Sequence, residues 1–175
     1  MFISSVVWAA DLSQTSEILE VPTPLKVGEE IPWFALIDAE DGFSPVNRRM
    51  LKAKAKAFGA EKIIFSYFAT WCLPCRQGTQ LLAKAADELK AKKVFVVMMN
   101  VGEDDQAKIH KWVNRFGNKD WPVLMDQFEK ISKSWGFYKE GEQAALPRTL
   151  VLDQDFKVIK FVGQEGNDWP GVLWN

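Results

Sequence analysis

Cysteine and histidine are scarce in this chain, and their scarcity excludes several kinds of site. Among 175 residues there are two cysteines, Cys72 and Cys75, and a single histidine, His110. With no third cysteine the chain cannot hold a framework of several disulfides. Structural zinc sites take four Cys or His ligands, and two cysteines with one histidine fall short of that number. We therefore expect no metal site.

The chain also lacks a charge excess of one sign and any long apolar run. Its net charge is −1, so the sequence predicts no basic surface for nucleic acid. No stretch approaches the roughly 20 apolar residues of a membrane span. The hydrophobic and charged shares, 47% and 26%, are typical of a globular domain. A chain of this length suits one domain with a short extension.

Two segments are predicted: a leader or linker over residues 1–24 and the domain over residues 25–175. Residues 1–10 (MFISSVVWAA) are mostly apolar and end in small residues, like the end of a secretory signal peptide. They lack a basic start and are short for the apolar core of such a signal. An irregular start is therefore the open alternative.

The domain alternates between strand and helix patterns. Nearly continuous apolar runs at 62–68 and 94–101 predict buried strands. Further strands are expected at 33–37 and 123–125, with a closing hairpin of 148–152 and 157–162. Helices are expected at 48–58, 72–92, a segment ending at 116, and 128–135. This order predicts an α/β fold with a central mixed sheet flanked by helices.

The motif Cys72-Leu73-Pro74-Cys75 lies where the strand at 62–68 gives way to a helix. A spacing of three within the first helical turn brings the two side chains close enough to bridge. Free backbone N–H groups and the positive helix end favour the thiolate of Cys72. The pattern predicts that Cys72 attacks a disulfide and that Cys75 resolves the mixed disulfide, or the reverse sequence.

Other uses of two cysteines at this spacing fit less well. A c-type haem site needs histidine after the second cysteine, and Arg76 stands there. A purely structural disulfide across three residues would constrain the unfolded chain little. We therefore expect a redox-active dithiol with no other cofactor.

Four stretches, 25–36, 64–76, 121–126 and 145–153, resemble the thioredoxin superfamily and within it the TlpA/ResA-like extracytoplasmic branch. The resemblance implies a thioredoxin-like fold and a thiol–disulfide oxidoreductase. It implies a reductase of extracytoplasmic protein disulfides, fed by a membrane thiol carrier of the DsbD/CcdA type. A periplasmic location follows if residues 1–10 are a signal, and a cytoplasmic one is the alternative. A monomer acting on protein disulfides or dithiols is expected.

The resemblance also assigns an active-site shell. Pro147 corresponds to the cis-proline of the superfamily, which would place the backbone of Leu146 beside Cys72. An extended substrate could pair there as an added strand. The shell would also include Trp71, Leu73 and Pro74.

The sequence departs from that family at two acidic positions. Thioredoxins carry a buried Asp six residues before the first cysteine, where this chain has Ser66. The branch often carries Glu three residues after the second cysteine, where this chain has Gly78. We therefore expect water, held by Ser66 or Thr70, to accept the proton of Cys75. Proteins of that branch usually add a last helix after the position of Gly163. In this sequence twelve residues follow Gly163.

Two other functions stay open. A thiol peroxidase of the peroxiredoxin class shares the fold but commonly uses Pro-x-x-x-Thr-x-x-Cys, whereas Thr70 lies only two residues before Cys72. A non-catalytic thioredoxin-fold binding module would use the groove around Pro147 without the dithiol. The sequence does not decide the direction of electron flow.

Overall fold

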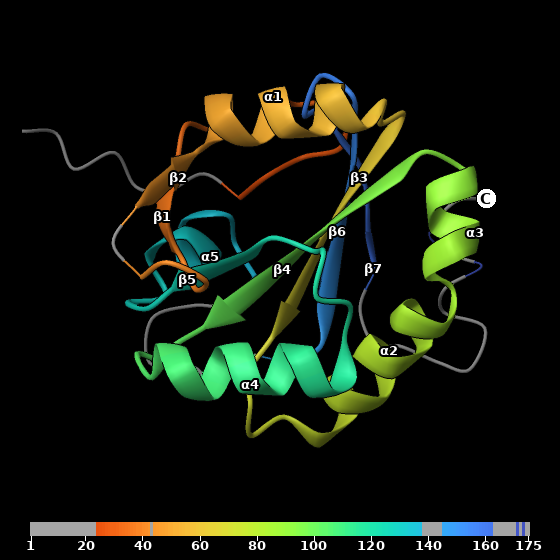
Figure 1. Cartoon of the computed structure of the whole chain (residues 1–175). Helices are drawn as coiled ribbons and strands as arrows, with labels where there is room; N and C mark the ends of the chain where they lie inside the picture. The colour runs from red at the N-terminus through yellow and green to blue at the C-terminus, as the bar shows by residue number, and fades with distance from the viewer. Residues whose placement is uncertain (1–23, 43, 138–144, 163–170, 172, 174–175) are drawn as a thin grey trace, which may run out of the picture.

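A seven-stranded mixed sheet forms the centre of the computed structural model, in the strand order β2-β1-β5-β4-β3-β6-β7 (Figure 1). The structure describes residues 24–42, 44–137, 145–162, 171 and 173. The predicted leader, except for Pro24, lies outside them. The β3–β4 and β4–β5 pairs are parallel, and the other neighbouring pairs are antiparallel. This confirms the α/β class and the mixed sheet.

The strands follow the apolar segments of the sequence. β3 and β4 lie at the middle of the sheet and are buried along nearly their whole length, which is why their sequences are almost continuously apolar. The bounds are β1 Ala35–Asp38, β2 Pro45–Asn47, β3 Lys62–Phe68, β4 Val94–Val101, β5 Val123–Asp126, β6 Arg148–Asp153 and β7 Val158–Val162.

Five helices connect or flank the described strands, and capping residues fix several of their ends. The Asn47 side chain accepts a hydrogen bond from the N–H of Met50 at the start of α1, and Gly59 ends that helix in the left-handed conformation. Asp105 caps α4 in the same way through the N–H of Lys108. The bounds are α1 Arg48–Phe58, α2 Leu73–Lys84, α3 Ala86–Ala91, α4 Gln106–Phe116 and α5 Lys130–Ser134.

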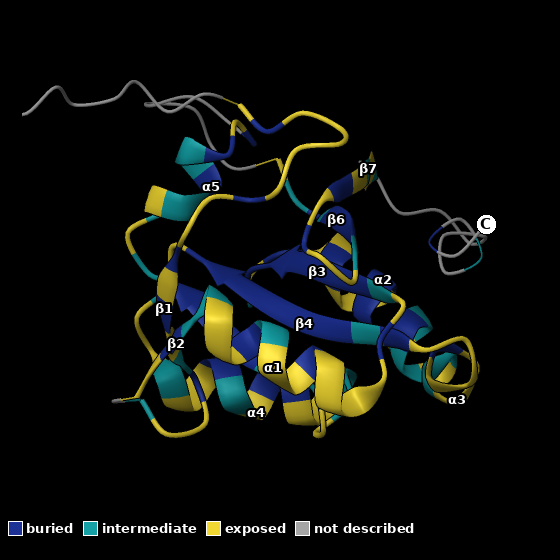
Figure 2. Cartoon of the chain, turned by 90° about the horizontal axis from the view of Figure 1, so that it is seen from above, coloured by how far each residue is buried: buried dark blue, intermediate teal, exposed yellow. Residues whose placement is uncertain are grey.

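Each face of the sheet carries its own hydrophobic cluster. α1 lies on one face, and α2 and α4 lie on the opposite one (Figure 1). Because side chains alternate along a strand, Ile63, Phe65 and Tyr67 of β3 belong to the α1 cluster. Ile64 and Phe68 belong to the cluster that contains both cysteines. The central strands β5, β4, β3 and β6 are buried, whereas the outer faces of the helices are exposed (Figure 2).

The segment before β1 is tied to the β6–β7 hairpin by the backbone. The N–H groups of Gly28 and Ile31 donate to Val158 and Phe156, at 2.8 and 3.0 Å. Val158 returns a 2.8 Å bond to Glu29. These bonds place residues 28–31 at the start of β7, far along the chain but adjacent in space. Across the described residues, no helix is both long and apolar enough to cross a membrane.

Two elements differ from the sequence expectation. The helix expected over 72–92 is two helices, because the backbone at Ala85 leaves helical geometry (φ −89°, ψ 7°). The break lets α3 turn onto β4, where Leu89 is buried. The short edge strand β2 was not expected, since three residues beginning with proline carry little strand signal.

Candidate active site

Cys72 and Cys75 form a disulfide at the start of α2, next to the end of the central strand β3. The S–S distance is 2.02 Å, and the two Cα atoms lie 5.3 Å apart. Cys72 is the N-cap residue of α2, and its Sγ accepts a hydrogen bond from the N–H of Cys75 at 3.2 Å. Pro74 lies in the first turn, where its missing N–H costs no helical bond. Cys72 therefore lies where the helix end can stabilise a thiolate.

The disulfide is covered, but the residues beside it are exposed. Cys72 and Cys75 expose 5% and 1% of their surface. Trp71 and Leu73 expose 55% and 57%, and both flank Cys72 in the chain. Pro74 is exposed as well. An apolar rim around a barely accessible sulfur suits contact with another polypeptide better than with a free small molecule.

Pro147 lies at the same end of the sheet as the dithiol. Arg148, the first residue of β6, pairs with Tyr67 in antiparallel register, so Pro147 lies level with the end of β3. Pro147 is buried, and the Leu146–Pro147 peptide bond is cis. Leu146 is partly buried and packs against both hydrophobic clusters, including the one that holds the cysteines.

Ser66 and Gly78 both lie on the cysteine side of the sheet. Ser66 is two residues from both Ile64 and Phe68 of that cluster, so it lies on the same face of β3, and it is 3% exposed. Gly78 is buried in α2, one turn beyond Cys75. Neither position supplies a carboxylate, as the sequence shows.

A carboxylate that sequence reasoning missed lies beside Thr70. Glu103, in the loop between β4 and α4, accepts hydrogen bonds from both the backbone N–H (2.6 Å) and the hydroxyl of Thr70. Asn100 Nδ2 and Lys108 Nζ also approach the Glu103 carboxylate, at 2.8 and 3.1 Å. The hydroxyl hydrogen of Thr70 is thus directed to Glu103, and only its lone pairs are left to hold a water.

The ionisation of Glu103 follows from these contacts. Burial alone would raise its pKa. The hydrogen bonds from Thr70, then Asn100 and Lys108, outweigh that effect and lower the pKa below the ordinary value of 4.5. Glu103 is therefore an anion at neutral pH. One sequence signal could have located it. The carboxyl ends of neighbouring parallel strands meet at one edge, so the loop after β4 lies beside the turn after β3.

Comparison with known proteins agrees with this geometry. The Redoxin family model matches residues 26–170, which is most of the chain. The chain belongs to the Redoxin family. Its sequence is also 26% identical over 133 residues to the thioredoxin-like protein YneN of Bacillus subtilis (strain 168). That match covers 74% of this chain and about two thirds (67%) of YneN.

Solved structures share the fold. A Chlorobium tepidum protein named as a thiol:disulfide interchange protein, DsbE, gives a TM-score of 0.64 at 21% identity. It covers 85% of this chain and 93% of its own. The peroxidoxin BcpB of Mycobacterium tuberculosis gives 0.63 at 19% identity, covering 86% and 94%.

Family membership together with the bridged Cys72–Cys75 pair makes this Redoxin chain a thiol–disulfide oxidoreductase of the thioredoxin superfamily. This confirms the recognition made from the sequence.

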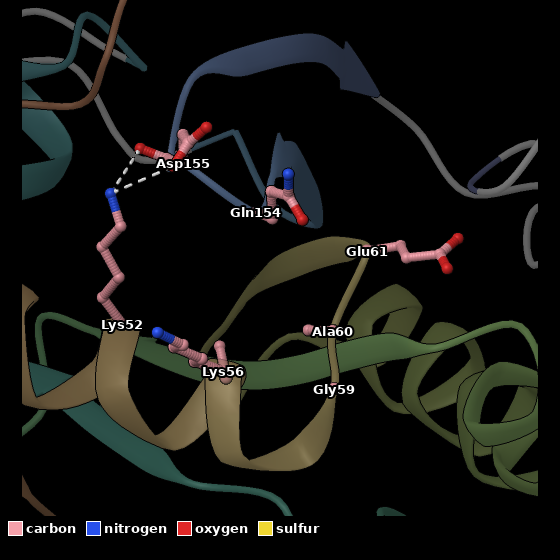
Figure 3. A pocket seen from close by; sticks show the side chains of 8 residues that line it. Lys52, Lys56, Gly59, Ala60, Glu61, Gln154 and Asp155 are labelled. Carbon is pink, nitrogen blue, oxygen red and sulfur yellow. Dashed lines mark hydrogen bonds and ion pairs between the residues drawn. The ribbon is translucent and has the colours of Figure 1, made fainter.

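A cavity of about 480 Å³ lies elsewhere on this Redoxin chain, between the end of α1 and the β6–β7 turn (Figure 3). Lys52 ion-pairs with Asp155 across its mouth, and Lys56, Glu61 and Gln154 also line it. It adjoins the edge where β3 begins, whereas the dithiol follows the edge where β3 ends. Within the described part of the chain, no three His, Cys, Asp or Glu side chains gather as metal ligands.

Proposed function

We propose that this Redoxin chain reduces protein disulfides, with Cys72 as the attacking thiol and Cys75 as the resolving one. The observation that carries the proposal is the place of Cys72 Sγ at the N-cap of α2. There it accepts the N–H of Cys75 at 3.2 Å. The same donor and the positive helix end would stabilise the Cys72 thiolate in the reduced protein, which makes Cys72 the nucleophile at neutral pH.

The exchange balances as two substitutions at sulfur. The Cys72 thiolate attacks one sulfur of the substrate disulfide and forms a mixed disulfide, while the other substrate sulfur leaves as a thiolate. Cys75 then loses its proton and attacks Cys72 Sγ. This releases the second substrate thiol and leaves the Cys72–Cys75 disulfide. A thiol donor must reduce that disulfide before the next turnover.

The proposed substrate is an extended polypeptide. Trp71 and Leu73 offer an exposed apolar rim beside Cys72, and Leu146 precedes the proline level with the end of β3. A substrate strand could pair with the backbone there while its side chains contact the rim. We also propose, from the TlpA/ResA resemblance, that the thiol donor is a membrane carrier of the DsbD/CcdA type. An extracytoplasmic location is part of this proposal.

The decisive experiment is insulin reduction by the full chain with dithiothreitol as the donor. We expect turnover in the wild type and none in Cys72→Ser. Cys75→Ser should instead trap a mixed disulfide through Cys72. Limiting iodoacetamide should label Cys72 of the reduced protein first, and labelling of Cys75 first would contradict the assigned roles.

The fold shared with the BcpB peroxidoxin supports a second candidate, thiol peroxidase. Its distinguishing assay is hydrogen peroxide turnover with the same thiol donor. Turnover of peroxide without turnover of insulin would replace the proposal. A chain inactive in both assays would favour a non-catalytic binding module.

Two measurements address the location and the donor. Cell fractionation of the tagged full chain, with sequencing of its N-terminus, tests whether cleavage occurs near Ala9 or Ala10. Membranes with and without a DsbD/CcdA-type carrier, mixed with the oxidised protein, test whether that carrier reduces Cys72–Cys75.

A further inference from the structure

Glu103 lies in a loop, yet its carboxylate is almost buried and accepts several hydrogen bonds. Its side chain is 10% exposed, although both of the following residues, Asp104 and Asp105, are exposed. Its two oxygens take hydrogen bonds from three separate elements: the turn after β3, the strand β4 and the helix α4. The donors are Thr70, Asn100 and Lys108.

A short turn connects Thr70, which is bonded to Glu103, with Cys72 of the dithiol. Thr70 donates both its N–H and its hydroxyl to Glu103. The turn closes when the N–H of Cys72 donates to the carbonyl of Ala69 at 3.1 Å. Fixing Thr70 within that turn therefore fixes the point at which Cys72 leaves the sheet and α2 begins.

The same contacts hold a negative charge near Cys72. The Thr70 N–H donates to Glu103 at 2.6 Å, and the Cys72 N–H donates at 3.1 Å to the carbonyl of the same Ala69–Thr70 peptide unit, so the Glu103 carboxylate lies within about 8 Å of the Cys72 backbone nitrogen. The neighbouring charges that modulate it are the Lys108 ammonium at 3.1 Å and the adjacent Asp104 and Asp105 carboxylates. Glu129 lies across the loop, next to Gly102, and it pairs with Lys133.

We infer that Glu103 is a positioning residue for the dithiol. Its hydrogen bonds to Thr70 hold the turn before Cys72 in place, and its negative charge repels the Cys72 thiolate. The inference rests on the disulfide exchange proposed above. Opposing the thiolate destabilises the reduced form, so Glu103 keeps the dithiol more reducing than the helix end alone would. Glu103 does not touch the sulfur atoms and is not itself a nucleophile or a base in this scheme.

The test compares Glu103→Gln with Glu103→Asp and with Thr70→Val. Glu103→Gln removes the charge, so the pH midpoint for alkylation of Cys72 should fall. The equilibrium with glutathione should shift toward reduced protein by about three- to tenfold, as expected for one charge near 10 Å with partial screening. Glu103→Asp keeps the charge and should restore both readouts to near wild type. Thr70→Val keeps the charge but loses the hydroxyl bond. It should slow insulin reduction about threefold, the factor expected for one lost hydrogen bond, with the midpoint unchanged.

The matched control is Glu61→Gln, since Glu61 is an exposed acid paired with Lys93 at the opposite end of β3. It should leave every readout at the wild-type value. The inference is overturned if Glu103→Gln leaves the midpoint and the glutathione equilibrium unchanged, or if Glu103→Asp shifts them equally. If Glu103→Gln does not fold, a wild-type rate in Thr70→Val overturns it.

These readouts separate the inference from the proposed function. Alkylation and glutathione equilibration need no protein substrate. A wild type that fails to reduce insulin would therefore refute the proposed reductase and leave the Glu103 comparison intact.

Discussion

Replacing Trp71 with alanine should lower the kcat/KM for insulin reduction about tenfold. Trp71 precedes Cys72 and is 55% exposed, so more than half of its surface is free to contact a substrate. A fully covered tryptophan buries roughly 150–250 Å², so roughly 80–140 Å² of this ring is left for a substrate to cover.

The expected loss follows from that area. At about 25 cal/mol per Å², full coverage would contribute roughly 2–3.5 kcal/mol to the complex. A bound substrate strand that covers about half of the ring would contribute about 1.4 kcal/mol, which is tenfold in kcat/KM. By the same accounting the covered part of the ring, roughly 70–110 Å², contributes about 1.7–2.8 kcal/mol to stability, so the unfolding midpoint should also fall, by roughly 3–11 °C.

The assay measures kcat/KM for insulin and, separately, the rate with glutathione disulfide. The small disulfide covers less of the ring and should lose less. Phe58→Ala is the control, because Phe58 is 39% exposed at the end of α1, near the edge where β3 begins. An insulin kcat/KM within twofold of wild type, or an equal loss in Phe58→Ala, would refute the reasoning.

Three further predictions concern other parts of the chain. Gly59→Ala should lower the unfolding midpoint by about 2–4 °C in a thermal melt with insulin reduction unchanged, because φ is +79° there and no atom clashes with a new Cβ. An unchanged melt would contradict this. Because the folded pKa of Glu103 lies below 4.5, its stabilising contribution is complete above the unfolded pKa and is lost as pH falls through the folded pKa. In urea titrations the stability gap between wild type and Glu103→Gln should therefore narrow from pH 7 to pH 3, and a constant gap would count against it. Ser66→Asp should add a second ionisation to the pH profile of insulin reduction, since a carboxyl buried beside the cysteine cluster has a raised pKa. A profile identical to wild type would argue against water as the proton acceptor.

The bounds of several elements could be predicted from local sequence alone. The bounds expected for β3 and β4 match the structure, because a buried central strand must be apolar on both faces. The bounds of α1 were also predicted, since Gly59 supplies a clear stop signal. The motif Cys72–Cys75 could also be located from the sequence, because the strand end, the helix start and the cysteine spacing are all local properties.

What the sequence could not predict depends on contacts between distant segments. Residues around Ala85 are good helix formers, so nothing local signals the break, and packing of α3 on β4 decides it. Glu103 lies 31 residues after Cys72, and its role rests on side-chain bonds to Thr70 that no spacing rule encodes. Pairing of β3 with β4 brings Glu103 beside Thr70, and distance along the sequence does not show this.

The separation of the two hydrophobic clusters has a consequence for how this protein can diverge. Phe34, Phe65 and Trp135 contact one another at ring-centroid distances of 5.6 to 6.2 Å on the face that lacks the cysteines. Substitutions there change the free energy of unfolding without altering the surroundings of the sulfur atoms. Substitutions on the face that lacks the cysteines can thus raise or lower the stability of the fold while the redox chemistry stays constant, and the two properties can be selected separately.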